Sequence, residues 1–118
     1  MSETVERKLI WMGQTRKDMQ SFPIEVRRSM GASLYYLQLG GMPKGANSFK
    51  GVGSGVLEIR LRYGTNAYRT VLAVQLGEKI YVLHAFQKKS KSGAKTPKND
   101  VELIRQRYKE AQELEKNG

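Results

Sequence analysis

The chain has 118 residues, no cysteine and a single histidine, and its 21 Lys and Arg against 11 Asp and Glu give a net charge of +10. This length supports one domain with its own hydrophobic core, but not a cleft between two lobes. The lack of cysteine excludes a disulfide framework, a thiolate nucleophile and a cysteine-based zinc site. We therefore expect a single domain, residues 1–118, whose chemistry takes place on its surface.

The sequence shows no feature of a membrane or exported protein. No apolar run approaches the roughly 20 residues that a membrane-spanning helix needs. The N-terminal residues MSETVERK also lack the apolar core of a signal peptide. We expect a cytoplasmic protein with no membrane partner.

The first third of the chain predicts one strand followed by two helices. Residues 7–12 form a short apolar run, long enough for a strand and too short for a helix. Residues 16–20 predict a short helix, and Pro23 marks the start of a second one, because its missing N–H would have no helical partner there. The second helix has an apolar stripe at spacings of four, four and three: Val26, Met30, Leu34 and Leu37. The two helices should form a hairpin that packs on one face of a sheet.

Residues 42–54 are rich in glycine and small polar residues, and they predict a loop. Gly51, Gly53 and Gly55 have the alternate spacing found in some nucleotide-binding loops. They precede a strand rather than joining a strand to a helix, and no GK[ST] sequence is present, which argues against a nucleotide site. Lys50 in this loop can still contact a nucleic-acid backbone.

The next three segments, 57–63, 67–76 and 79–86, predict the strands of an antiparallel meander. They are rich in β-branched and aromatic residues and are separated by short turns that contain glycine. With the N-terminal strand, they predict a twisted antiparallel sheet of about four strands. Between residues 55 and 98, nine Lys or Arg stand against two Asp or Glu, so this stretch carries a net charge of +7. A polyanion is the natural partner of such a stretch.

Two arginines of the first of these strands share a face, because Arg60 and Arg62 are two residues apart. If Arg69 on the next strand lies opposite, three guanidiniums converge, and we expect all three to face solvent. Such a cluster suits a phosphodiester, because guanidinium donates bidentately to phosphate. The alternative is a solvated face on which the arginines pair with carboxylates such as Glu58.

Further basic residues end the third strand and fill the loop behind it. Lys88 and Lys89 should lie at the rim of the arginine face and Lys91 in the loop, with ordinary solubilising charge as the alternative. His84 lies among apolar residues, which favours a half-buried, hydrogen-bonded histidine over a general base. No cluster of Asp, Glu and His suggests a metal-dependent nuclease, and we expect no cofactor.

The last helix is predicted to start after Thr96-Pro97. It has its own apolar stripe: Val101, Ile104, Tyr108 and Ala111. The complete pattern predicts an α+β domain with helices on one side of the sheet and a basic surface on the other.

Three short strings carry a family resemblance: residues 57–60 (LEIR), Tyr68-Arg69, and residues 83–89 (LHAFQKK) followed by Thr96-Pro97. With this order of elements, they resemble the RelE/HigB superfamily of toxins from type II toxin–antitoxin modules. Within that superfamily they are most similar to the phage-derived HigB-like branch. The resemblance covers a core of about residues 5–112 and implies a RelE/ParE-like fold, with a helix hairpin packed on one face of the sheet and a C-terminal helix.

The resemblance implies an endoribonuclease that cuts mRNA in the ribosomal A site without a metal, by attack of a ribose 2′-OH on the adjacent phosphate. In that scheme Arg69 stabilises the transition state, while Arg60 and Arg62 contact the scissile region. We assign catalysis to Arg62, Arg69 and Lys89, and RNA binding to Arg60, Lys88, Lys91 and Lys50. The chain lacks the tyrosine that follows the last strand in RelE-type enzymes and the C-terminal histidine of HigB enzymes. The identity of its general acid or base therefore stays open.

The resemblance also implies a cognate antitoxin, a small helix-turn-helix protein of the HigA type, besides the ribosome and mRNA. Two other functions stay open. One is a ParE-like inhibitor of DNA gyrase, and the other is a non-catalytic or decayed nucleic-acid-binding homologue of the toxins.

Overall fold

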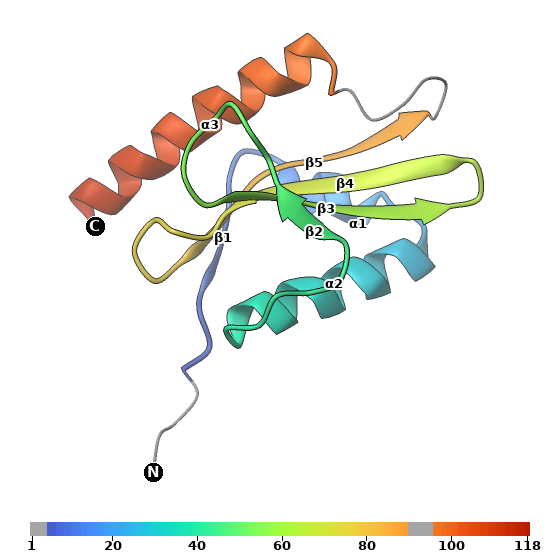
Figure 1. The fold of residues 1–118 in the computed structure, drawn as a ribbon, viewed down its shortest axis with the longest axis horizontal. Coiled ribbons are helices and arrows are strands. Elements are labelled where there is room, and N and C mark those ends of the chain that lie inside the picture. The colour runs from blue at the N-terminus through green and yellow to red at the C-terminus, as the bar shows by residue number, and fades with distance from the viewer. Residues whose placement is uncertain (1–4, 90–95) are drawn as a thin grey trace.

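The computed structural model describes residues 5–89 and 96–118, which contain five strands and three helices. In chain order these are β1 (Leu9–Trp11), α1 (Thr15–Gln20), α2 (Ile24–Gln38), β2 (Ala46–Ser48), β3 (Val56–Tyr63), β4 (Asn66–Ala73), β5 (Ile80–Lys89) and α3 (Lys98–Asn117). The sheet lies between α2 on one side and α3 on the other (Figure 1). The predicted α+β class is confirmed.

The strands form one mixed sheet in the order β1-β5-β4-β3-β2. The predicted antiparallel meander of β3, β4 and β5 is confirmed, and Gly64 turns the chain between β3 and β4 at a φ of +63°, a conformation that favours glycine. The prediction of an entirely antiparallel sheet of about four strands is wrong in two respects. β1 runs parallel to β5, which is possible because the chain between them, with α1, α2 and the strands β2 to β4, is far longer than the dozen or so residues that a parallel pair needs. β2 is a fifth strand inside the predicted loop, too short to show a periodic pattern.

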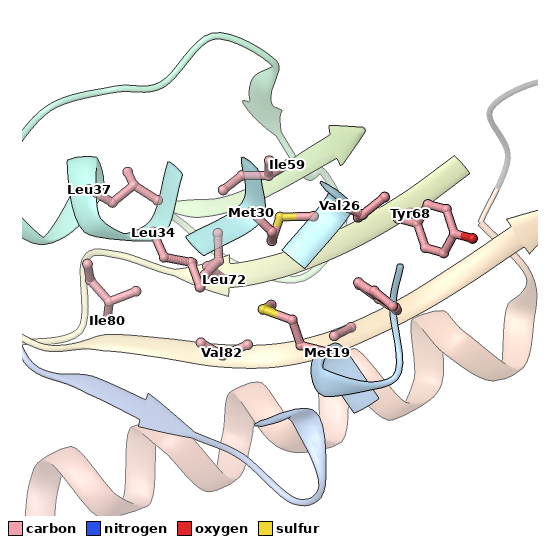
Figure 2. Packing of buried hydrophobic residues seen from close by; sticks show 12 residues of the cluster. Met19, Val26, Met30, Leu34, Leu37, Ile59, Tyr68, Leu72, Ile80 and Val82 are labelled. Carbon is pink, nitrogen blue, oxygen red and sulfur yellow. The ribbon is translucent and has the colours of Figure 1, made fainter. Parts of the chain in front are cut away.

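Helices α1 and α2 cover one face of this sheet. The predicted stripe of α2 is confirmed, because all four of its residues are buried. They pack with Met19 of α1 and with Ile59, Leu72 and Val82 of the sheet (Figure 2). The helix ends before Gly40, whose φ of +92° stops further helical turns. Apolar periodicity was therefore sufficient to predict the buried face of α2.

Helix α3 covers part of the opposite face (Figure 1). Its buried residues Ile104 and Ala111 pack with Val56, Val71 and Leu83 of the sheet. The prediction that all helices lie on one side of the sheet is therefore wrong. Both faces of the sheet are apolar near the start of β3, and the second face also needs a cover to exclude water. The charged side chains of Arg60, Arg62 and Lys88 lie toward the other end of that face.

Replacing Ile104 by Ala is expected to lower the free energy of unfolding by about 2–5 kcal/mol, because the side chain is fully buried and a cavity would remain. Leu114→Ala on the same helix is the matched control, since Leu114 is 51% exposed. That change should stay within about 0.5 kcal/mol. Urea denaturation of both variants measures the difference, and equal losses would contradict the packing of α3 on the sheet.

Candidate active site

The face of the sheet opposite α1 and α2 carries a cluster of basic residues from three adjacent strands. Arg60 of β3 is paired directly with Arg69 of β4. In the next row, Arg62 of β3 is paired with Ala67 of β4, and Ala67 with Lys88 of β5. Directly opposite residues share a face of the sheet, with side chains that start about 5 Å apart. The predicted position of Arg69 opposite Arg60 is confirmed, and Arg62 and Lys88 lie in the next row of the same face; we call these four residues the cation cluster.

Arg69 is the buried centre of the cation cluster, with 2% of its surface exposed. Its Nη1 donates to Glu58 Oε2 at 3.3 Å and to Thr96 Oγ1 at 3.2 Å. Burial lowers the pKa of Arg69, against the opposing effect of Glu58. The prediction that Arg69 faces solvent is wrong, because β4 is the central strand and its arginine is bonded on both sides, to β3 and to the segment before α3.

Glu58 connects two of the arginines. Its Oε1 accepts from Arg60 Nη2 at 3.2 Å, and its Oε2 accepts from Arg69 Nη1. The side chain of Glu58 is 10% exposed and that of Arg60 is 41% exposed. The paired-charge alternative is thus confirmed for these two arginines, whereas Arg62 forms no ion pair within residues 5–89 and 96–118. The exposed sides of Arg60 and Arg62 therefore remain accessible to an anion.

Lys88 is the residue of the cluster that carries an amine, which can lose its proton, whereas arginine keeps its proton in proteins. It is half-buried, and burial lowers its pKa, helped by the positive charges of Arg69 and Arg60. A lysine with a lowered pKa has a larger neutral fraction near neutral pH, and a neutral amine can accept a proton. Lys88 was predicted only as an RNA-binding residue, because the effect of two arginines on other strands cannot be recognised from the local sequence.

The remaining predicted basic residues are Lys50, Lys89 and Lys91, and the structure describes the side chain of Lys50 alone. The backbone of Lys89 is paired with Asn66, one row beyond that of Lys88. The side chain of Lys89 and the whole of Lys91 lie outside the described residues, and their roles stay predictions. Lys50 is exposed in the loop before β3, whereas the cluster lies in the second half of that strand.

His84 lies in the row next to Arg69 but is held by structural contacts. Its Nε2 is 2.7 Å from Asp100 Oδ1, and its Nδ1 is 3.5 Å from Arg107 Nη1. The ring stacks on Phe86, with centroids 4.5 Å apart. The prediction of a hydrogen-bonded histidine is confirmed, but His84 is buried, with 7% of its surface exposed, and not half-buried as predicted. Because both ring nitrogens are engaged, His84 is poorly placed as a general base, and it instead joins β5 to the first turn of α3.

Fold and site together define a class of protein: a small, basic α+β domain with a cation cluster suited to a phosphodiester. In the part of the chain that the structure describes, no three His, Asp or Glu side chains gather as metal ligands. None of the described helices has the length and apolar character needed to cross a membrane.

The chain belongs to the family of the phage-derived Gp49-like proteins (DUF891), whose model matches residues 17–109. This match includes the whole cation cluster but does not single out the HigB-like branch.

A similar solved structure is the crystal structure of the toxin–antitoxin complex RelBE2 from Mycobacterium tuberculosis, with a TM-score of 0.49 and 14% sequence identity. The matched region covers 76% of this chain and 100% of that chain. No curated protein matches the chain in sequence.

Proposed function

We propose that this protein is the toxin of a type II toxin–antitoxin module and cleaves mRNA on the ribosome. Membership in a phage-derived family and the resemblance of the strings in β3, β4 and β5 to RelE and HigB toxins support this function. The observation that carries the proposal is the gathering of Arg60, Arg62 and Lys88 around the buried Arg69 on one sheet face. Such a surface complements a phosphodiester in charge and in hydrogen-bonding geometry.

In the proposed reaction, the ribose 2′-OH attacks the adjacent phosphate, and the bond to the 5′-oxygen of the next nucleotide breaks. Arg60 and Arg62 donate to the non-bridging oxygens, on which negative charge builds in the transition state. Lys88 in its neutral form accepts the proton of the 2′-OH. The products are a 2′,3′-cyclic phosphate and a 5′-hydroxyl, whose proton comes from water or from the protonated Lys88.

Arg69 acts in this proposal chiefly through other residues. It is too buried to form the main contact with RNA, but its positive charge lies beneath the reacting phosphate and favours the neutral form of Lys88. Glu58 fixes the guanidiniums of Arg69 and Arg60 relative to each other. Donors that are already in position need no reorganisation during the reaction, which is why such pairing favours catalysis.

The proposed partner is a small antitoxin of the helix-turn-helix, HigA-like type, encoded beside this gene. Its complex would cover part of the cationic face or hold the toxin away from the ribosome. An antitoxin that covers this face should carry a complementary negative surface. Co-expression of the neighbouring open reading frame is expected to yield a stable complex and to relieve growth arrest. If neither occurs, the partner assignment is wrong.

Induction of this protein is expected to stop incorporation of labelled amino acids within minutes while incorporation of labelled thymidine continues. Cleavage of mRNA blocks translation directly and leaves DNA replication templates intact. A ParE-like gyrase inhibitor would give the reverse order, with DNA synthesis stopping first. Normal incorporation of both labels would favour a non-catalytic homologue and contradict the proposed function.

A further inference from the structure

A groove of about 430 Å³ lies between the glycine-rich loop before β3 and the outer side of α3. The loop contributes Gly51, Val52 and Gly53, and the helix contributes Arg105, Tyr108, Lys109 and Gln112. The glycine spacing of this loop is similar to that of some nucleotide-binding loops, but the loop precedes a strand and contains no GK[ST] sequence. The structure shows a different use of these glycines, because they form one wall of a groove against a helix.

Two contacts hold this wall in place. Arg105 Nε donates to the carbonyl oxygen of Gly51 at 3.0 Å. A Cβ atom at Gly53 would lie 2.5 Å from the ring of Tyr108, so the aromatic ring packs directly against bare backbone. A side chain at position 53 would push Tyr108 away. The close approach of loop and helix therefore requires glycine there.

The groove is cationic and contains an aromatic ring. Arg105 and Lys109 are exposed, no carboxylate lines the groove, and neither cation forms an ion pair within the described residues. Lys50, also exposed, directly precedes the loop. Cations that follow a phosphate backbone, combined with a ring on which a base can stack, are typical of single-stranded nucleic-acid sites.

The position of the groove connects it to the cation cluster. Arg60 of β3 lies seven residues after Gly53 of the groove, and seven fully extended residues span at most about 25 Å. One strand of nucleic acid advances about 3.4 Å per stacked nucleotide. An RNA held at the cluster therefore reaches the groove within several nucleotides.

We infer that this groove binds single-stranded RNA at a position several nucleotides from the phosphate held by the cation cluster. The inference rests on the proposed function, since it extends the same RNA along the protein. Lys109 and Arg105 contact phosphates, and Tyr108 stacks on a base. The groove thus adds affinity for the RNA segment that flanks the reacting nucleotide.

Fluorescence anisotropy with a labelled 12-nucleotide single-stranded RNA of mixed sequence tests this inference on the free protein. The first variant is Arg105→Glu/Lys109→Glu, and its control is Lys98→Glu/Lys116→Glu, which makes the same charge change on exposed residues of the same helix. The groove variant should bind at least about 10-fold more weakly than the control. The slope of its plot of log Kd against log salt concentration should also be smaller by about 1.4, which is about 0.7 for each of the two lost phosphate contacts.

A second pair of variants tests stacking. Tyr108→Leu should weaken binding about 5- to 100-fold with an unchanged salt slope, whereas Tyr108→Phe keeps the ring and should stay within about twofold. Thermal melting of each variant establishes that it is folded.

Several results would overturn the inference: no RNA binding by the wild type, equal binding by the groove variant and its control, or a groove variant that keeps RNA binding but loses the antitoxin complex. The last result would identify a protein-docking surface instead. Because binding is measured without ribosomes, it is independent of cleavage. Absence of ribosomal cleavage by the wild type would reject the proposed function, whether or not the groove binds RNA.

Discussion

Arg69→Ala is expected to lower the free energy of unfolding by about 3 kcal/mol. Removing one partner of a buried ion pair typically costs about 3–5 kcal/mol, because the other charge stays buried without compensation. The lower end applies here, since Arg60 still donates to the other oxygen of Glu58. The bond from Arg69 to Thr96 is lost as well, which loosens the start of α3. Urea denaturation measures this change.

Two further variants separate stability from activity. Arg62→Ala is the matched control, because Arg62 is exposed and forms no ion pair in the described part of the chain, so its stability should change by at most about 0.5 kcal/mol. The double variant Glu58→Gln/Arg69→Met removes both charges and should recover much of the stability lost by Arg69→Ala. Its cleavage of A-site mRNA on purified ribosomes should nevertheless fall about 10²–10³-fold, as for other lost preorganised charges. If this double variant is folded and cleaves mRNA at the wild-type rate, the proposed site is wrong.

Lys88→Ala is expected to reduce the cleavage rate about 10²–10⁴-fold, the range for loss of a general acid or base. The second variant, Lys88→Arg, separates the effect of positive charge from the effect of proton transfer. Arginine keeps the positive charge but does not release its proton at any accessible pH, so it should not restore the rate. Single-turnover cleavage read by primer extension measures both variants. Lys44→Arg, an exposed change outside the cluster, should cleave like the wild type.

The same lysine predicts a pH dependence. Burial and two neighbouring arginines lower the pKa of Lys88, so its neutral fraction grows as the pH rises toward that lowered value. The wild-type rate should therefore rise with pH, and the rate of Lys88→Arg should rise less over the same range. A Lys88→Arg variant with the rate and pH profile of the wild type would show that Lys88 supplies only charge.

Much of the fold was predictable, because the relevant information is local. The stripe of α2, the meander of β3 to β5 and the starts of α2 and α3 each follow from residues that are close in the chain. The shared face of Arg60 and Arg62 follows from strand alternation in the same way. The parallel pairing of β1 with β5 was missed, because these strands are far apart in the chain and neither strand by itself determines its partner or its direction.

The sequence by itself determined the charge of the protein, the identities of the clustered arginines and the strands that carry them. Only the tertiary structure decided which of these residues are exposed to solvent. Arg69 became the buried partner of Glu58 because β4 lies at the centre of the sheet, and His84 became a link to α3 because Asp100 of that helix packs beside it. The lowered pKa of Lys88 and the groove at Tyr108 arise in the same way. The burial and the electrostatic environment of a residue depend on segments far apart in the chain, so a local sequence pattern does not predict them.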